Sequence, residues 1–99
     1  MANESPYRGL SPAPSAQIVV TTGPDVPGFR IVQVLAVVHG VAIRPAGASN
    51  AVVRATRDTA AQRLLEEARG LGANAIIGMR YDSTAEEVCA YGTAVRISG

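Results

Sequence analysis

The longest apolar segment of the chain, residues 29–43 (FRIVQVLAVVHGVAI), carries few polar side chains on either face of an extended strand. The even-numbered positions of one face read Val32, Val34, Ala36 and Val38, and the odd-numbered face is also largely apolar. Strands that are covered on both faces show this pattern. Gly40 within the run indicates a bulge or a bend. We therefore predict one long bent strand, or two strands that share this segment.

Three shorter segments also have the composition of strands. Residues 18–22 (IVVTT) are rich in β-branched side chains, and residues 23–28, with two Pro and two Gly, form a turn or tight loop after them. Residues 73–83 and residues 88–98 both alternate between two faces. Because only a short polar connection separates the last two segments, we predict that they form an antiparallel hairpin.

A helical period runs from residue 51 to residue 71. One stripe of apolar positions repeats at spacings of three, four and seven, and it consists of Val53, Ala60, Leu64, Ala68 and Leu71. Ser49 or Asn50 is placed to cap the first turn, with Asp58 as a later candidate. Gly70-Leu71-Gly72 provides a left-handed C-terminal cap.

The opposite face of this predicted helix is charged. Arg54 and Asp58, and likewise Arg63 and Glu67, stand four residues apart. Pairs at this spacing face each other on a helix and contribute about 0.2–0.5 kcal/mol each. We therefore expect these residues to form ion pairs on a solvated surface.

The predicted order is β-β-α-β-β, which indicates an α+β domain with one helix on a small, curved, mostly antiparallel sheet. One helix covers one face of a sheet, yet the long apolar segment favours burial of both. Large uncovered apolar area on a small chain usually marks a contact between subunits. We therefore predict a homo-oligomer, with Val32, Val34, Ala36 and Val38 at the interface.

The N-terminal segment has a different composition from the rest of the chain. Residues 1–16 include three Pro and three Ser and show no apolar period. Such a segment is typical of a disordered arm, or of one that becomes ordered on a partner. The predicted folded domain comprises residues 17–99.

Composition and charge exclude several classes of protein. The 99 residues carry a net charge of +1, with no basic excess of the kind that binds nucleic acid. No apolar run reaches the ~18 residues of a membrane-spanning helix, and no apolar signal-peptide region is present. The single cysteine cannot form an internal disulfide. We expect a soluble, cytoplasmic protein.

Candidate chemistry is sparse. His39 and Cys89 are the two soft metal ligands, with Asp82, Glu86 and Glu87 as nearby carboxylates, whereas zinc-type sites take three or four ligands. Repetition of His39 or Cys89 around a symmetry axis of an oligomer would supply more metal ligands. The alternative is that Cys89 is a small apolar core residue and His39 lies at a strand end. A Cys89–His39 catalytic pair lacks a helix N-terminus or oxyanion donors, so we expect no enzyme.

Three segments resemble a known family. Residues 21–40, residues 68–78 (ARGLGANAIIG) and residues 92–95 (GTAV) are similar to YbjQ-like domains, which are described as heavy-metal-binding. The resemblance implies an initial hairpin, a subunit grouped with dodecin-like folds, a homopentamer and a bacterial source. It leaves the physiological role open, with a divalent transition metal as the cofactor that the family description implies.

This sequence also departs from the family pattern. The connection between the second strand and the helix, residues 42–55, is shorter than is usual in the family. His39 stands where the family usually has a small polar residue, so it is not carried over as a family ligand.

Overall fold

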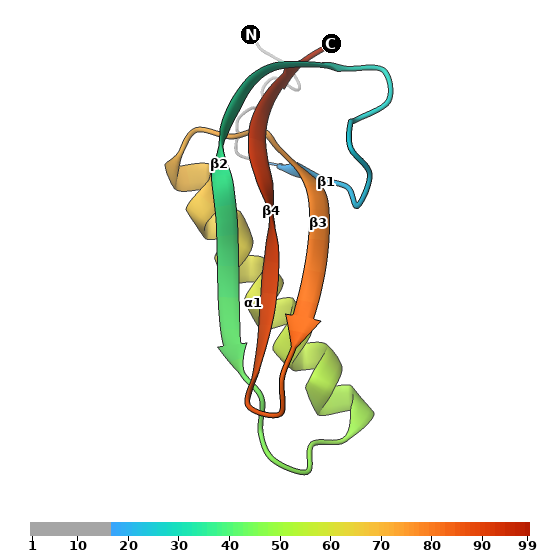
Figure 1. The fold of residues 1–99 in the computed structure, drawn as a ribbon, viewed down its shortest axis with the longest axis vertical. Helices are drawn as coiled ribbons and strands as arrows, with labels where there is room; N and C mark the ends of the chain where they lie inside the picture. Colours follow the sequence, from blue (N-terminus) through green and yellow to red (C-terminus); the bar gives the residue numbers. More distant parts are fainter. Residues whose placement is uncertain (1–16) are drawn as a thin grey trace, which may run out of the picture.

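The computed structural model describes residues 17–99, so the predicted arm at residues 1–16 lies outside the described residues. Four strands and one helix follow the predicted order: β1 (Val19–Val20), β2 (Arg30–Ile43), α1 (Asn50–Gly70), β3 (Ala75–Ser83) and β4 (Glu87–Ser98). The helix lies across one face of the sheet, diagonally to the strands (Figure 1). The predicted α+β class, with one helix on a mostly antiparallel sheet, is confirmed.

The strands form one open sheet in the order β1-β3-β4-β2. β3 and β4 make the predicted antiparallel hairpin, and β2 pairs antiparallel with the other edge of β4. β1 pairs parallel with β3, with Val19 beside Ala75. The initial hairpin implied by the resemblance is therefore wrong, because the first two strands occupy opposite edges of the sheet.

β2 is bent, but not where the sequence indicated. The register against β4 shifts between Ile31 and Gln33 and again between Val34 and Ala36, and it is regular at Gly40. Each shift changes which side chains face the helix, because alternation along a strand is strict only between bulges. Gly40 instead lies where the backbone of α1 comes closest to β2, as a Cβ there would collide with the backbone of Ala60 and Leu64.

The helix begins and ends as the sequence predicts. Ser49 is the N-cap, and its side-chain oxygen accepts a hydrogen bond from the backbone N–H of Val52 at 3.4 Å. Gly72 follows the C-terminus in the left-handed region, with φ of 82°. The buried stripe contains Thr56, Ala60, Leu64 and Ala68, whereas Leu71 is exposed, contrary to the predicted stripe.

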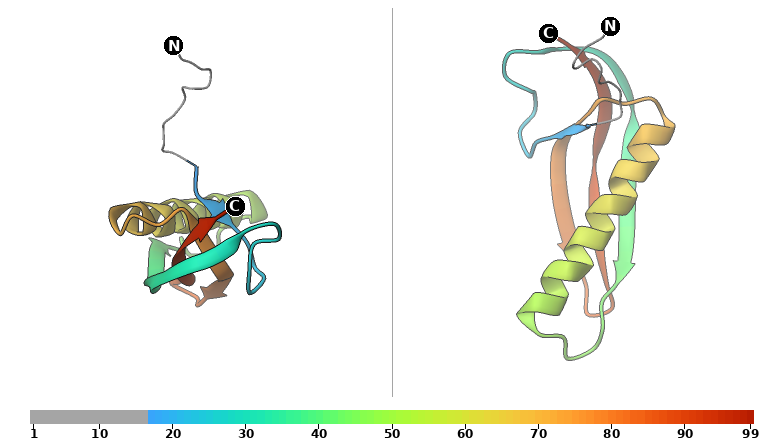
Figure 2. Two further views of the ribbon diagram at one scale, coloured as in Figure 1. Left: turned by 90° about the horizontal axis from the view of Figure 1, so that it is seen from above. Right: turned by 180° about the vertical axis from the view of Figure 1, so that it is seen from behind.

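Two clusters of apolar side chains make the core. The larger lies between α1 and the sheet and is built around Leu64, Ile76, Val38 and Val88. The smaller lies on the other face of the sheet, where Val26 from the loop after β1 covers Ala75, Val95 and Ile97. Figure 2 shows this loop wrapping one end of the sheet while the helix fills the layer behind it. No other segment of the described residues covers the rest of that second face.

No helix in the described part of the chain is long and apolar enough to cross a membrane.

Candidate functional site

We call the sheet surface that faces away from α1 the open face. The register across the strands defines it, because side chains of directly paired residues lie on the same side of a sheet. Its β2 residues are exposed and mostly apolar, and its β4 and β3 residues are mixed. Its members are Val34, Val37, His39, Val41 and Ile43 from β2, Cys89, Tyr91 and Thr93 from β4, and Arg80 and Asp82 from β3.

The apolar residues of the open face are unusually exposed for their type. Val34 is 65 %, Val37 59 % and Ile43 74 % exposed. Val41 and Tyr91 are partly covered, at 38 % and 37 %. Val37, Val41 and Ile43 lie on the same side of β2, with His39 between Val37 and Val41.

The four residues predicted at an interface do not all lie on this surface. Val32 and Val34 are exposed, and Ala36 is half-buried. Val38 is fully buried in the core beneath α1, so its placement on an exposed face is wrong. The cause is the register shift between Val34 and Ala36, which places Val37 rather than Val38 on the face of Val34.

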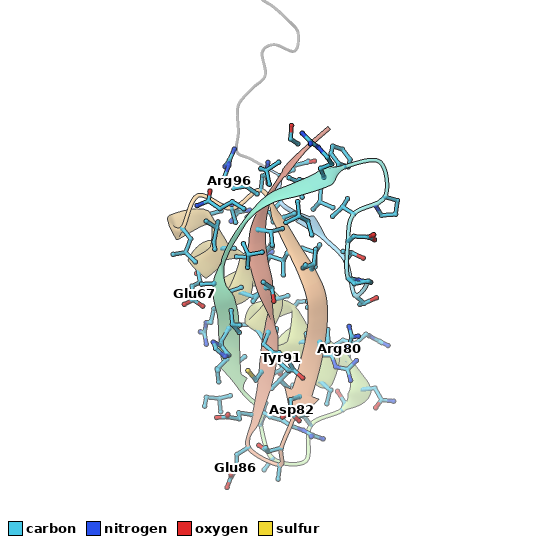
Figure 3. The ribbon with its side chains drawn as sticks, turned by 45° about the horizontal axis from the view of Figure 1, so that its top comes forward. Glu67, Arg80, Asp82, Glu86, Tyr91 and Arg96 are labelled. Carbon is cyan, nitrogen blue, oxygen red and sulfur yellow. The ribbon has the colours of Figure 1, made fainter. Side chains whose placement is uncertain are left out.

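The two predicted metal ligands do lie on one face. His39 is paired with Tyr91, and Cys89 is paired with Val41, so His39 and Cys89 are diagonal neighbours on the open face. Asp82 of β3 pairs with Cys89 from the other side, and Arg80 pairs with Tyr91. Figure 3 shows Tyr91, Arg80 and Asp82 close together on the hairpin. The sheet thus gathers a polar patch from three strands.

One arginine of β3 and one of β4 are held by backbone carbonyls. Arg80 donates from Nη1 to the carbonyl oxygens of Thr22, at 2.7 Å, and Met79, at 2.8 Å. Arg96 donates to the carbonyl oxygen of Gly72, beside the C-terminus of α1. Arg96 does not join Arg80 and Asp82 in this patch, because it lies near the opposite end of β4 (Figure 3).

The Cys89 thiol is biased towards its protonated form. Partial burial raises its pKa above the ordinary value, and the negative charges of Glu87 and Asp82 raise that pKa further. A thiol needs to lose its proton to act as a nucleophile or a metal ligand. The surroundings of Cys89 therefore oppose both roles in the isolated protomer.

A metal site is incomplete in one protomer. Across residues 17–99, no group of three or more His, Cys, Asp or Glu side chains is placed to hold a metal ion. His39 and Cys89 supply two soft donors, one or two fewer than a zinc-type site takes. The described residues of a single chain therefore do not by themselves fit the heavy-metal group that the resemblance implies.

Sequence reasoning missed the role of two helix residues. Glu67 accepts a hydrogen bond from the backbone N–H of His39 at 2.7 Å, and Arg63 donates to the backbone carbonyl of Val41 at 2.6 Å. Figure 3 shows Glu67 beside the outer edge of β2. The i, i+4 spacing predicted that Arg63 and Glu67 would pair with each other. The periodicity showed which residues lie on one side of the helix, but not that an unpaired strand edge would lie within their reach.

Beside that edge is a shallow cleft of about 330 Å³ between β2 and the first half of α1. Its walls include Ile43 from the strand and Val52 and Arg63 from the helix. The cleft is open to solvent and has mixed polarity.

Comparisons with known proteins agree on the family. A family model described as "Putative heavy-metal-binding" matches residues 45–98. A UPF0145 protein of Streptomyces griseus is 37 % identical, over 91 % of this chain and 93 % of its own length. A UPF0145 protein of the archaeal Saccharolobus islandicus is 32 % identical, over 86 % and 95 %. Relatives therefore occur in archaea as well as bacteria, which widens the implied bacterial source.

A solved structure agrees with the fold. The crystal structure of a protein with unknown function, of the DUF74 family from Pediococcus pentosaceus, superposes with a TM-score of 0.52. It is 21 % identical, over 82 % of this chain and 98 % of that chain. The sequence matches confirm the YbjQ-like resemblance, and the chain belongs to the UPF0145 family.

Proposed function

We propose that this chain is a non-enzymatic assembly domain, in which copies of the chain cover each other's open face and form a closed ring. One observation carries the proposal: Val34, Val37 and Ile43 are all more than half exposed, and all three lie on the open face. Isolated exposed apolar residues are ordinary, but a continuous apolar face indicates a binding surface.

A second copy of the chain is the occupant that the observations favour. A chain of this size buries only ~60–65 % of its unfolded surface, so it gains much from covering apolar area by association. Its net charge of +1 opposes self-association very little. The YbjQ-like resemblance implies five copies, and we adopt a ring of five as the proposed state, with display of a ligand as its role.

Light scattering after size-exclusion chromatography tests this proposal with one variant and a matched control. Val37→Asp places a charge on the open face, and we expect it to give the 10.2 kDa protomer where the unchanged chain is larger. Val52→Asp is the control, because Val52 is an exposed valine of the helix that lies outside the open face, and we expect it to keep the larger mass. Equal masses for the two variants would contradict a contact through the open face.

Metal binding by the assembled protein is the second candidate function. It is favoured by the placement of His39 and Cys89 as diagonal neighbours on the surface that other copies would cover. A ring would add donors from a neighbouring copy to these two. We therefore propose a divalent transition metal between subunits as the alternative ligand.

Native mass spectrometry after loading with Zn²⁺, Cu²⁺ or Ni²⁺ distinguishes the candidates. The metal hypothesis predicts bound ions that are lost in the His39→Ala, Cys89→Ala double variant. If the double variant binds as much metal as the unchanged chain, these two residues are not the ligands. A ring without bound metal supports the assembly role alone.

A further inference from the structure

Within residues 17–99, no other strand pairs with the outer edge of β2. β2 is the last strand in the order of the described sheet, so no described strand bonds to one side of its backbone. Arg44 donates its backbone N–H to Glu86 across the β2–β4 ladder, at 2.8 Å. Because residues of an antiparallel strand point their backbone groups alternately to the two sides, the N–H and C=O groups of His39, Val41 and Ile43 point outwards.

Exposed strand edges of this kind pair readily with strands of other molecules. This edge belongs to a strand of 14 residues whose side chains are largely apolar. Without protection, such an edge would add further chains in an open-ended way rather than close a ring of defined size. Natural proteins obstruct such edges with charged side chains or with bulges.

Both forms of protection are present on β2. The first half of the strand has two register shifts, which distort the ladder geometry that an added strand would need. In the second half, the Glu67 carboxylate occupies the outward N–H of His39, and the Arg63 guanidinium occupies the outward C=O of Val41. These are charge-assisted bonds of 2.7 and 2.6 Å.

Gly40 lets the helix reach this position. It is fully buried between His39 and Val41, and the backbone of α1 at Ala60 and Leu64 lies against it. The close approach carries the next helix positions, Arg63 and Glu67, over the edge of β2. The backbone contact and the two side-chain bonds thus belong to one arrangement.

We infer that Arg63 and Glu67 cap the outer edge of β2 against strand addition, so that further copies of this chain meet through the open face and not by extending the sheet. The second part of this inference, that further copies meet through the open face, rests on the proposed assembly. The edge cap itself stands on contacts within one protomer.

Hydrogen exchange at individual amides, measured by NMR on the unchanged full chain, tests the cap without any substitution. We expect the His39 amide to exchange slowly, and the outward amides of Val41 and Ile43 to exchange quickly even in the assembled protein. Slow exchange at Val41 and Ile43 that disappears on dilution to protomers would show that a strand pairs there, and would overturn the inference.

Substitutions of Glu67 then test whether its side chain protects the His39 amide. Glu67→Ala removes the acceptor, and we expect the His39 amide to exchange about tenfold faster, the effect of losing roughly 1.4 kcal/mol of hydrogen bonding. Glu67→Gln retains an oxygen that accepts the bond, so it should stay within a few-fold of the unchanged rate. Equal rates in Glu67→Ala and the unchanged chain would refute the contact.

The Arg63→Ala, Glu67→Ala double variant tests the consequence. We expect it to form heterogeneous high-mass species that bind thioflavin T, whereas the Arg54→Ala, Asp58→Ala variant, a matched pair on the same helix, does not. A double variant with the same mass distribution as the unchanged chain would contradict the cap. If the unchanged chain is a protomer of 10.2 kDa while the exchange results hold, the proposed function fails and the edge cap remains.

Discussion

Gly40 of β2 and Ala60 of α1 are in backbone contact, with no room for a side chain between the strand and the helix. A Cβ on Gly40 would overlap the carbonyl oxygen of Ala60, and the Leu64 amide nitrogen lies almost as close. Neither backbone atom can move away without shifting the helix. The distance between α1 and the sheet is therefore set at this glycine.

Gly40→Ala should destabilise the protein by about 1–3 kcal/mol, because overpacking forces the surrounding backbone to shift. Urea unfolding followed by circular dichroism measures the change. Gly70→Ala is the control: no atom lies within 4 Å of its Cβ, and alanine at a helical position gains up to about 1 kcal/mol. A Gly40→Ala variant as stable as Gly70→Ala would contradict the close contact.

Asn74 should contribute more to the stability of the fold than its half-buried position suggests. Its side chain donates to the Ile97 carbonyl at 3.0 Å and accepts from the Ile97 N–H at 2.7 Å, in place of a strand partner. Asn74→Ala leaves both backbone groups of Ile97 unpaired, at a cost of about 1–3 kcal/mol. The urea midpoint reports this loss.

The control for Asn74 is Asn50→Ala. Asn50 is exposed in the first turn of α1, where alanine is the better helix former, so the midpoint should change little. Two variants with the same small change would show that the Asn74 bonds to Ile97 contribute nothing measurable.

Much of the fold is predictable from periodicity, while strand partners are not. The 3.6-residue period located α1, and the short polar connection identified the β3–β4 hairpin. β1 has two residues, Val19 and Val20, too few to encode a partner or a register. Its parallel pairing with β3 depends on the loop at residues 21–29, which crosses the end of the sheet (Figure 2).

The candidate site was predictable only in part, for a physical reason. One helix can cover only one face of a sheet, so an uncovered apolar face can be predicted without knowing the register of the strands. Predicting which residues are exposed does need the register, because the shift between Val34 and Ala36 puts Val37, and not Val38, on the face of Val34. The bonds of Glu67 to β2 depend on the helix position above Gly40, which no local pattern encodes.

Cys89 should react slowly with thiol reagents at pH 8. Partial burial and the charges of Glu87 and Asp82 raise its pKa, so less thiolate is present than for a free cysteine. The Glu87→Gln and Asp82→Asn variants remove those charges, lower the pKa, and should increase the iodoacetamide rate. Glu86→Gln, on the same turn, is the control. Equal rates in all four proteins would contradict this electrostatic account.

The same pKa shift gives a pH dependence of stability. The folded state holds the Cys89 proton more tightly than the unfolded state does, so the folded state binds more protons above the ordinary thiol pKa of 9.0. Stability from this group is complete below that pH and declines as pH rises through the raised value. Cys89→Ser should therefore show a smaller loss of urea stability between pH 8 and pH 10.

The mass of the unchanged protein tests the central claim most directly. A native mass spectrum of the full chain, recorded at micromolar concentration, should show one closed species of about five times the 10.2 kDa protomer. A spectrum that contains the protomer alone at all concentrations would contradict the account, because the open face would then be stable in water without another copy to cover it.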